Sequence, residues 1–479
     1  MSISKYTTPG VFIKNITPQP SPITSVEIAI PAFIGYTEKA TRAAAGDLTL
    51  RPTRITNLQE YEHYFGYPQP ENKSLSIVFN QTTVGTDVVA QINEQRRSKY
   101  LMHYSLQFYF ANGGGACWIT SVGDYSQNVI APEKLNEGLK KVARKKEVTL
   151  LLFPDAVNIA SAADYYHMYS RAIAQATRLR NRFVIMDVFH DAAHGSEWKL
   201  DIDDPGGNGG LRNLLSGGPQ QLGFAAAYFP KIFTSIPFSY QTPGSSDDNE
   251  RLIRIRGASA TTLAALKKKN NAEYLQATNA LSKIPMLLPA SPGVAGMYAK
   301  VDKSKGVWKA PANVNLEKAI RTEHQITDVQ QENLNVDVIG GKSINVIRSF
   351  AGRGDAIVWG SRTLAGNDNE WRYVPVRRYC LMLEQSIRIS LKQFRREAND
   401  QNLWQQVRGL IENYLTEQWK AGALQGIKPE HAFYVRAGLG TTMTPTDIQN
   451  GNLIAEIGVA VIRPAEFVIP RFFEKMIAG

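Results

Sequence analysis

The chain has 479 residues, of which 43% are hydrophobic and 20% are charged, a balance typical of globular proteins. At about 100–200 residues per domain, this length corresponds to two to four domains. No run of ~18 apolar residues occurs, so we expect no membrane insertion. The first residues lack the basic and apolar regions of a secretory signal, so we expect no export by that route.

The net charge of +11 comes from 54 basic and 43 acidic residues and is spread along the chain. This spread is typical of solvated surfaces, and a basic face that meets an acidic partner is the alternative. No basic motif is interleaved with aromatic residues, so we expect no nucleic-acid partner. Cys117 and Cys380 are isolated and indicate buried apolar residues in a protein made in a reducing cytoplasm.

Residues 1–24 form an N-terminal arm. Prolines at positions 9, 18, 20 and 22 exclude a helix there. A short β-type segment within the arm comprises Val11, Phe12, Ile13 and Ile16.

Short apolar strands alternate with helices from residue 25 onward. We expect strands at 25–36, 116–122, 148–153, 183–188 and 223–228, and helices at 57–65, 98–111, 132–144, 162–179 and 211–215. This alternation predicts an α/β outer domain over residues 25–314, with a parallel or mixed sheet covered on both faces. Residues 241–283 combine a loop with a polar helix and are interpreted as an insertion or elaboration.

Residues 315–466 are expected to form an α+β assembly domain. Its predicted strands are 336–339, 344–347, 356–359, 431–435 and 453–462, and its predicted helices are 376–398 and 403–421. The first two strands are expected to form a hairpin around Gly340, Gly341, Lys342 and Ser343. A C-terminal arm over residues 467–479 follows.

The strand predicted at Leu453–Ile462 carries apolar residues at both parities, which favours a strand covered on both faces, either by its own fold or by neighbouring subunits. Pro464 then ends the ladder because proline has no N–H to donate. A second β-rich segment, Phe467–Phe473, extends almost to the end of the chain. Chain ends usually fray unless another element holds them, which raises the question of which sheet this segment joins.

None of the motifs tested for chemistry has the context that the chemistry requires. Gly341-Lys342-Ser343 is not a phosphate loop, because position 336 is Val336 where that motif has glycine. The two histidines of His190-Asp191-Ala192-Ala193-His194 follow a strand rather than share a helix face, so we expect no metal site. Asp187 and His190 lack a nucleophile elbow, so a strand-end anchor is the expected role of Asp187. We therefore expect no catalytic residue and no cofactor.

One basic constellation stands out in the predicted helix 376–398. It comprises Arg388, Lys392, Arg395 and Arg396. These residues lie at positions i, i+4, i+7 and i+8, beside an apolar stripe of the same helix. Four cations along one helix repel one another unless solvent or an acidic partner compensates for them. A solvated face and a partner-binding surface both fit this pattern.

Several phrases, read in order, resemble those of contractile-tail sheath proteins, which belong to contractile bacteriophages and phage-tail-like injection particles. They are TPGVF at Thr8–Phe12, FYFANGGGACWITSVG at Phe108–Gly123, LLFPDA at Leu151–Ala156, GVWKAPAN at Gly306–Asn313, VWGSRTL at Val358–Leu364, VPVRRY at Val374–Tyr379, GAL-x-G at Gly422–Gly426 and IGVAVIRPAEF at Ile457–Phe467. Together they run over essentially the whole chain. The departures are local, at residues 241–283 and at Ala460–Arg463.

The resemblance implies a structural subunit that stacks as hexameric rings around an inner tube and contracts. It implies a subtilisin-like topology for the middle domain without protease activity, and arms that complete sheets in neighbouring subunits. On this basis we expect 453–462 to pair within its own domain. We expect strand donation from Val11, Phe12, Ile13, Ile16, Phe467, Val468, Ile469 and Phe472, and inner-tube docking by Arg388, Lys392, Arg395 and Arg396, with the helix at 403–421 as the alternative.

The implied partners are other copies of this chain, the inner tube protein, and baseplate and terminator or cap proteins. We expect assembly in the bacterial cytoplasm and then a place in a phage tail or a released particle. A phage, an injection system and a bacteriocin-like particle all remain open. The alternative function is a subtilisin-like or metal-dependent hydrolase.

Overall fold

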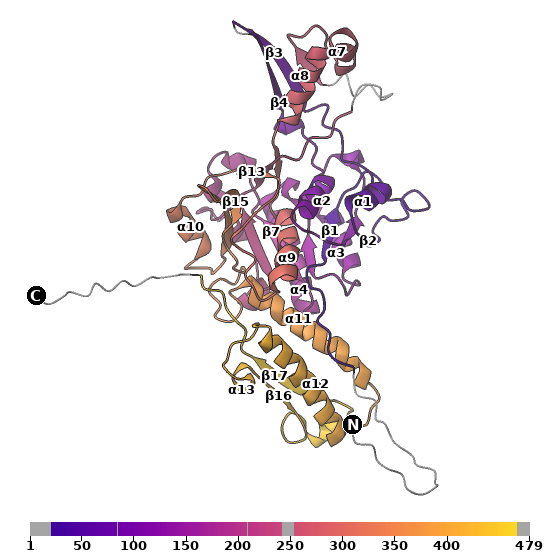
Figure 1. Ribbon diagram of the computed structural model, residues 1–479, viewed down its shortest axis with the longest axis vertical. Helices are drawn as coiled ribbons and strands as arrows, with labels where there is room; N and C mark the ends of the chain where they lie inside the picture. The colour runs from indigo at the N-terminus through magenta and orange to yellow at the C-terminus, as the bar shows by residue number, and fades with distance from the viewer. Residues whose placement is uncertain (1–20, 84, 208, 242–252, 467–479) are drawn as a thin grey trace, which may run out of the picture. The chain divides into compact units, whose positions relative to one another are not determined.

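The computed structural model of the protein describes residues 21–83, 85–207, 209–241 and 253–466 (Figure 1). These residues form two compact units. The large unit comprises residues 27–382 and 462–466, and the small unit comprises residues 21–26 and Leu383–Val461. No helix of the described part of the chain is long and apolar enough to cross a membrane.

The large unit is built around a nine-stranded sheet with the order β12-β15-β14-β8-β7-β6-β1-β5-β2. The strands are β1 (Pro31–Gly35), β2 (Thr53–Ile55), β5 (Cys117–Ser121), β6 (Leu150–Leu152), β7 (Phe183–Asp187), β8 (Ala225–Phe229), β12 (Val314–Asn315), β14 (Ile344–Phe350) and β15 (Gly354–Val358). The six strands from β14 to β5 run parallel, and the outer strands are antiparallel to their neighbours. This confirms the predicted mixed α/β fold.

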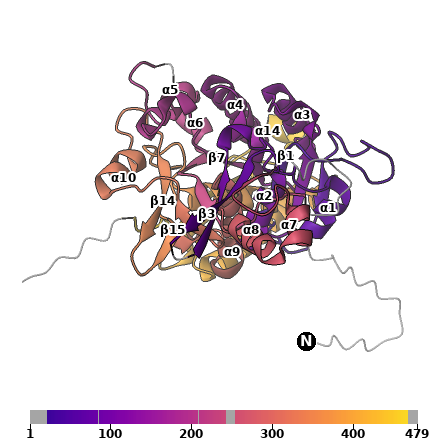
Figure 2. The same cartoon turned by 90° about the horizontal axis from the view of Figure 1, so that it is seen from above.

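Helices cover both faces of this sheet (Figure 2). One face carries α3 (Pro132–Val142), α4 (Ala162–Leu179), α5 (Leu211–Leu214) and α6 (Pro219–Leu222), and the other carries α2 (Met102–Ala111) and α9 (Ser291–Lys305). Helix α1 (Leu58–Phe65) packs beside α2. Strands β1, β6, β7 and β8 are buried at every position, which explains why the sequence shows apolar runs there instead of alternation.

Two buried carboxylates connect the sheet to the helices on one face. Asp155 accepts hydrogen bonds from the N–H of Leu101 (2.6 Å), at the start of α2, and of Tyr36 (2.7 Å). Asp187 accepts them from Ala290 (2.7 Å) and Ser291 (3.0 Å), at the start of α9. Burial raises the pKa of Asp155 to about 7 and that of Asp187 to about 6, although these N–H groups lower both. Asp187 thus has the anchoring role that its place at a strand end indicates.

A second hydrophobic core lies in the large unit. It joins the hairpin β3 (Leu75–Thr82) and β4 (Gly85–Ile92) to β10 (Arg254–Arg256), α7 (Leu263–Lys269) and α8 (Asn271–Ser282). The sequence did not lead us to predict the hairpin. The described part of the 241–283 elaboration packs against it. A further three-stranded sheet comprises β9 (Ile232–Thr234), β11 (Met286–Leu288) and β13 (Ala319–Thr322).

The hairpin predicted over 336–347 is wrong. Helix α10 (Asp328–Asn335) ends at this point, and the Asp337 carboxylate accepts hydrogen bonds from the N–H groups of Ile339, Gly340 and Lys342 at 3.0–3.1 Å. These bonds close a turn where a strand was expected. Strand β14 pairs instead with β8 and with β15.

The expected domain boundary near residue 315 requires correction. Strands β14 and β15 hydrogen-bond into the sheet that contains β8, so this region belongs to the large unit. The division between the units falls inside α11 (Val374–Ser390), between Met382 and Leu383. In the large unit, the fully buried Arg378 guanidinium forms an ion pair with Asp302 of α9.

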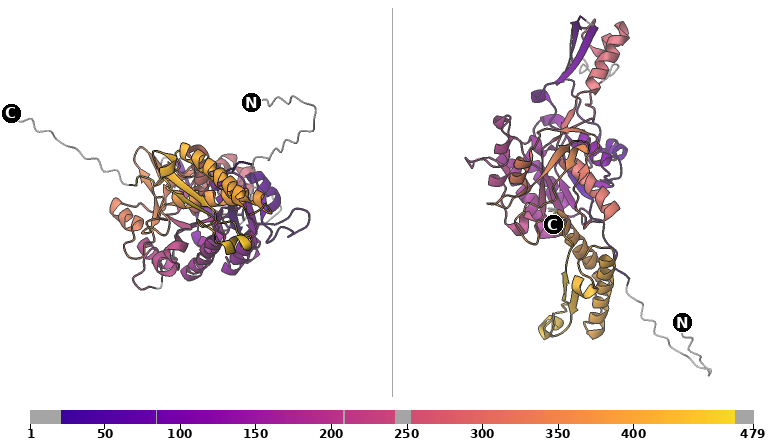
Figure 3. Two further views of the ribbon diagram at one scale, coloured as in Figure 1. Left: turned by 90° about the horizontal axis from the view of Figure 1, so that it is seen from below. Right: turned by 60° about the vertical axis from the view of Figure 1, so that its left-hand side comes forward.

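The small unit contains the end of α11, then α12 (Gln401–Lys420), α13 (Pro429–Ala432), β16 (Phe433–Ala437), α14 (Pro445–Gln449) and β17 (Ala455–Val459). The helix predicted to run to residue 398 ends at Ser390 and continues as a short 3-10 turn, η7 (Leu391–Phe394). The Gln393 amide donates to the Ser390 carbonyl (3.0 Å), one of the carbonyls that a helix end leaves unpaired. Figure 3 shows the two-stranded sheet beside α12, in gold and yellow.

Candidate assembly surfaces

The two-stranded sheet of the small unit has open edges. Strands β16 and β17 are antiparallel, and Phe433 lies opposite Val459. The pairing continues one step further, where the N–H of Ala460 donates to the carbonyl of Ala432 (2.8 Å). The prediction that 453–462 pairs within its own domain is therefore confirmed.

The edge of β17 can be read from this register. Backbone groups alternate between the two sides of a strand, and Ala460 faces β16, so Glu456 and Gly458 also face β16. The N–H and C=O groups of Ala455, Ile457 and Val459 consequently point away from β16. In the described part of the chain, no backbone partner pairs with them. This edge can accept another strand.

The two faces of the sheet differ within this chain, and cover of the exposed face by a neighbouring subunit stays a prediction. One face carries Val435, which is buried, and α12 packs against β16. The other face carries Tyr434, whose hydroxyl donates to Glu456 Oε1 (2.9 Å), and it is exposed to solvent. A side chain at Gly458 would meet the Tyr434 ring at 2.1 Å, so the ring would have to move to accommodate it. The apolar residues that suggested a second covered face lie beyond the strand.

Residues 21–26 fix the point from which the N-terminal arm leaves the small unit. The N–H of Ser21 donates to Gln393 Oε1 (2.9 Å), and the N–H of Val26 donates to Ser386 Oγ (3.0 Å). The hydroxyls of Ser25 and Tyr414 share a hydrogen bond of 2.9 Å. A groove of about 1080 Å³ lies between this segment and α12. The predicted donating residues Val11, Phe12, Ile13 and Ile16 lie outside the described residues.

Glu466 fixes the corresponding point for the C-terminal arm, on the large unit. Its carboxylate accepts hydrogen bonds from Arg362 Nε and Nη2 (both 2.7 Å), Asn335 Nδ2 (2.8 Å) and the Tyr373 hydroxyl (3.0 Å). Burial works to raise the pKa of Glu466, but these donors outweigh it and lower the pKa below its usual range. A bidentate arginine pair of this kind defines position as well as strength. The predicted donating residues Phe467, Val468, Ile469 and Phe472 lie outside the described residues.

The sequence did not lead us to predict this contact between Arg362 and Glu466, which we call the clamp. Arg362 and Glu466 are 104 positions apart, and neither was singled out. Both lie within phrases that carried the resemblance, VWGSRTL and IGVAVIRPAEF. A search for opposite charges shared between those phrases could have paired them.

The basic constellation does not form one helical stripe. Arg388 lies on α11, Lys392 lies in η7, and Arg395 has an extended backbone. Arg396 has a positive φ of 75°. All four side chains are exposed, so they form a basic stretch over a helix end and the loop that follows it.

The residues tested for catalysis have structural partners. His190 and His194 both bond through Nδ1 to the buried Asp201, each at 2.7 Å, and the hydrogen bond to Asp201 raises the pKa of His194. Lys342 donates its ammonium to the carbonyls of Arg212 (2.5 Å) and Leu215 (2.7 Å). Within the described ranges, no cluster of three or more His, Cys, Asp or Glu side chains is arranged to hold a metal.

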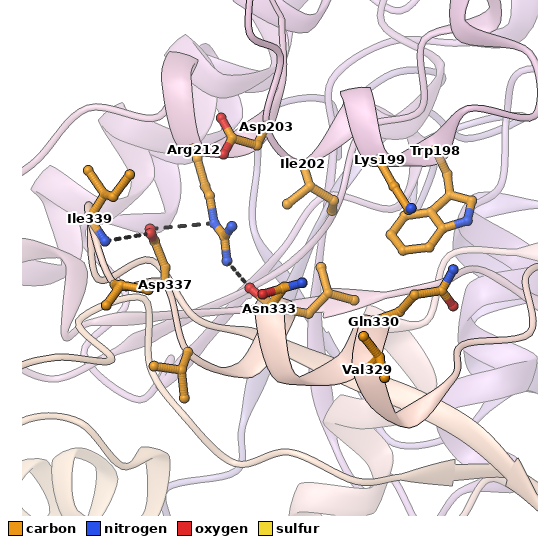
Figure 4. Close-up of a pocket in the computed structure, with 13 residues that line it drawn as sticks. Trp198, Lys199, Ile202, Asp203, Arg212, Val329, Gln330, Asn333, Asp337 and Ile339 are labelled. Carbon is orange, nitrogen blue, oxygen red and sulfur yellow. Dashed lines mark hydrogen bonds and ion pairs between the residues drawn. The ribbon is translucent and has the colours of Figure 1, made fainter.

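A pocket of about 410 Å³ in the large unit is lined by α10, by residues 198–203 and by the Asp337 turn (Figure 4). Arg212 joins two of these walls, because it donates to the Asn333 carbonyl (2.5 Å) and forms an ion pair with Asp337 (3.4 Å). Val329, Val338 and Ile339 are exposed at its rim.

Comparisons with known proteins agree with an assembly role. Residues 366–473 match the family described as the phage tail sheath C-terminal domain. The chain is 25% identical to the PVC sheath of an extracellular contractile injection system in the contracted state, with a TM-score of 0.63 and 99% of each chain covered.

The helical sheath of the anti-feeding prophage in the contracted state is 27% identical, with a TM-score of 0.65, and the match covers 99% of this chain and 100% of that one. A chain of the anti-feeding prophage baseplate is also 27% identical, with a TM-score of 0.63 and coverage of 98% and 99%. No curated protein matches the chain.

Proposed function

We propose that this chain, a contractile tail sheath protein, polymerises as stacked hexameric rings around an inner tube and contracts to drive that tube through a target envelope. It is the sheath subunit of a contractile injection system. The observation that carries this conclusion is the likeness to chains of the sheaths of two such systems over 99% of this chain.

The arms hold the array together by strand donation. The β16–β17 sheet has open edges, and each arm leaves from a fixed point, Ser21 in the small unit and Glu466 in the large unit. A donated strand forms backbone hydrogen bonds along an edge, and its alternate side chains fill pockets. A head-to-tail contact of this kind propagates as a helix instead of closing as a dimer.

Contraction is a rigid-body change of subunits connected by these tethers. The extended array is metastable, and after its release by the baseplate the subunits rotate outward while the donated strands remain paired. No nucleotide is needed, because the free energy is stored during assembly. Cap and baseplate proteins complete the ends of the array.

The exposed basic stretch of Arg388, Lys392, Arg395 and Arg396 docks on an acidic inner tube. Its support is charge alone, and α12 is the alternative tube-facing element. Electrostatic docking between exposed charges weakens with salt because the Debye length falls to about 8 Å at physiological ionic strength.

Assembly takes place in the bacterial cytoplasm, and the finished particle acts outside the cell that made it. The parallel core of the nine-stranded sheet supports a subtilisin-like topology that has lost, or never had, a catalytic role. The hydrolase alternative is disfavoured because Asp187 binds backbone N–H groups while His190 binds Asp201. A peptidase assay with and without a chelator separates the two functions.

The direct test is the removal of one arm. Deletion of residues 1–20 or 467–479 should abolish polymerisation and leave a folded monomer, since neither deletion touches the described units. Circular dichroism and sedimentation report the fold, and electron microscopy reports the sheath. Normal sheaths from either deletion would refute strand donation.

A further inference from the structure

The turn that closes the pocket beside α10 presents two aliphatic side chains to solvent. Val338 is 86% exposed and Ile339 is 98% exposed, whereas Asp337 at the base of the turn is only 6% exposed. Because isolated exposed apolar residues are common on protein surfaces, their arrangement matters more than their exposure.

This arrangement is held rigidly. Besides the three N–H groups of the turn, Asp337 binds the Arg212 guanidinium, and its carbonyl accepts a hydrogen bond from Asn367 Nδ2 (2.8 Å). A buried carboxylate with this many donors fixes the turn and keeps its two aliphatic side chains at the rim. Such preorganisation lowers the cost of binding a partner.

The opposite wall completes an apolar surface. Val329, on α10, is 69% exposed, and Leu334 forms part of the floor. Figure 4 shows Trp198 and Ile202 across the pocket from Val329 and Gln330. A concave site with apolar walls and a few fixed polar groups is suited to an apolar peptide segment.

The end of the described chain lies close to this pocket. Glu466 binds Asn335, and Leu334 and Val336 on either side of Asn335 line the pocket. Thirteen residues follow Glu466, and their sequence FVIPRFFEKMIAG is rich in aromatic and aliphatic side chains. At about 3.3 Å per extended residue, Phe472 can reach a point roughly 20 Å from Glu466.

We propose that residues 467–479 dock in the pocket of their own chain, against α10 and the Val338–Ile339 turn, before the subunit joins the array. The docking is intramolecular, and the hydrogen bonds that hold Glu466 keep the start of the segment beside the pocket, which raises its effective concentration there. The consequence, that the arm is withheld from premature polymerisation, rests on the proposed function. The docking itself does not.

Limited trypsin digestion of the full-length protein, at a concentration where it is monomeric, tests the docking. Trypsin cleaves after Arg471 and Lys475, and a docked segment is protected there. The double substitution Val338→Asp and Ile339→Asp should accelerate loss of the C-terminal peptides by about tenfold, which corresponds to 1.4 kcal/mol of lost docking. The control is Val129→Asp, at an exposed valine of the large unit outside the pocket lining. Equal cleavage rates for all three proteins would overturn the proposal.

A photocrosslinker placed at Phe472 identifies the docking site. Unlabelled and ¹⁵N-labelled chains are mixed before irradiation, so that mass spectrometry separates bonds within a chain from bonds between chains. We expect unmixed products that join Phe472 to peptides containing residues 198–202 or 329–339. Products of mixed label, or products that join β16 or β17, would overturn docking in the free subunit. Mixed-label products at β16 or β17 would leave strand donation standing.

Docking and donation therefore fail separately. If the double substitution exposes the arm and sheaths still form, the pocket holds the segment and the proposed function stands. If wild-type trypsin digestion shows no protection while deletion of residues 467–479 abolishes sheaths, docking is refuted and donation is retained.

Discussion

Proline substitution at matched positions of β16 and β17 tests the open edges of the sheet without disturbing the ladder between the two strands. Ala455 begins β17 and lies opposite Ala437, which ends β16. The N–H of Ala455 points away from β16, on the outer edge of β17. By the same alternation, the N–H of Ala437 points away from β17, on the outer edge of β16. Proline at either position therefore removes an outward donor and adds a ring at the edge, while the hydrogen bonds between β16 and β17 remain.

The size of the effect follows from the register. A strand added to β17 meets three outward residues, each with one donor and one acceptor, and each hydrogen bond contributes about 1 kcal/mol. Ala455→Pro removes one donor and displaces the incoming strand beside it. We expect a loss of about 1–2 kcal/mol per subunit contact, which raises the critical concentration for polymerisation by roughly 5–30-fold.

Sedimentation of polymer over a concentration series measures this critical concentration. Ala455→Ser and Ala437→Ser are the controls, because serine keeps the N–H and should polymerise as the wild type does. Crosslinking from each arm then shows which arm uses which edge. If both proline variants remain folded and polymerise at the wild-type critical concentration, the donated strands do not use this sheet.

Three further variants, two single and one fourfold, test other contacts. Arg378→Leu should lower the free energy of unfolding by about 3–5 kcal/mol, because it leaves Asp302 without its buried partner, and urea denaturation measures this. Glu466→Gln should loosen the C-terminal arm and speed its cleavage at neutral pH. The pKa of Glu466 is lower in the folded protein than in the unfolded chain, so the clamp contributes its full stability above the unfolded pKa. That stability is lost as the pH falls through the lower folded pKa. The cleavage rates of wild type and variant should therefore converge in acid. A fourfold charge reversal should abolish sheath assembly on the tube at low salt. It replaces four residues with Glu, namely Arg388, Lys392, Arg395 and Arg396. If assembly survives, these side chains form only a solvated face.

Local sequence signals were sufficient to predict an element where the residues that start and end it lie within or next to that element. The prediction for α4, residues 162–179, agrees with the structure because Ser161 caps the helix and the side chain at that position accepts the Asp164 N–H. The buried strands β7 and β8 were similarly visible as short apolar runs between helices. The terminal strand was also placed correctly, although β17 is shorter than predicted and spans Ala455–Val459.

Tertiary contacts decided the elements that local signals did not predict. The helix expected to run to residue 398 stops at Ser390, where Gln393 binds both the helix end and Ser21, far away in the sequence. Val336–Ile339 has a strand-like composition, but Asp337 recruits three backbone N–H groups into a turn. The clamp between Arg362 and Glu466 depends on the same kind of long-range contact, which neither residue's neighbours reveal.

The most direct test of the central claim is negative-stain electron microscopy of the protein expressed together with its genomic neighbours. A contractile sheath predicts striated tubes in two forms, one long and narrow and one short and wide, with an inner tube emerging from the short form. Tubes of a single length under conditions that trigger release, or soluble subunits alone in the presence of tube and baseplate proteins, would contradict it.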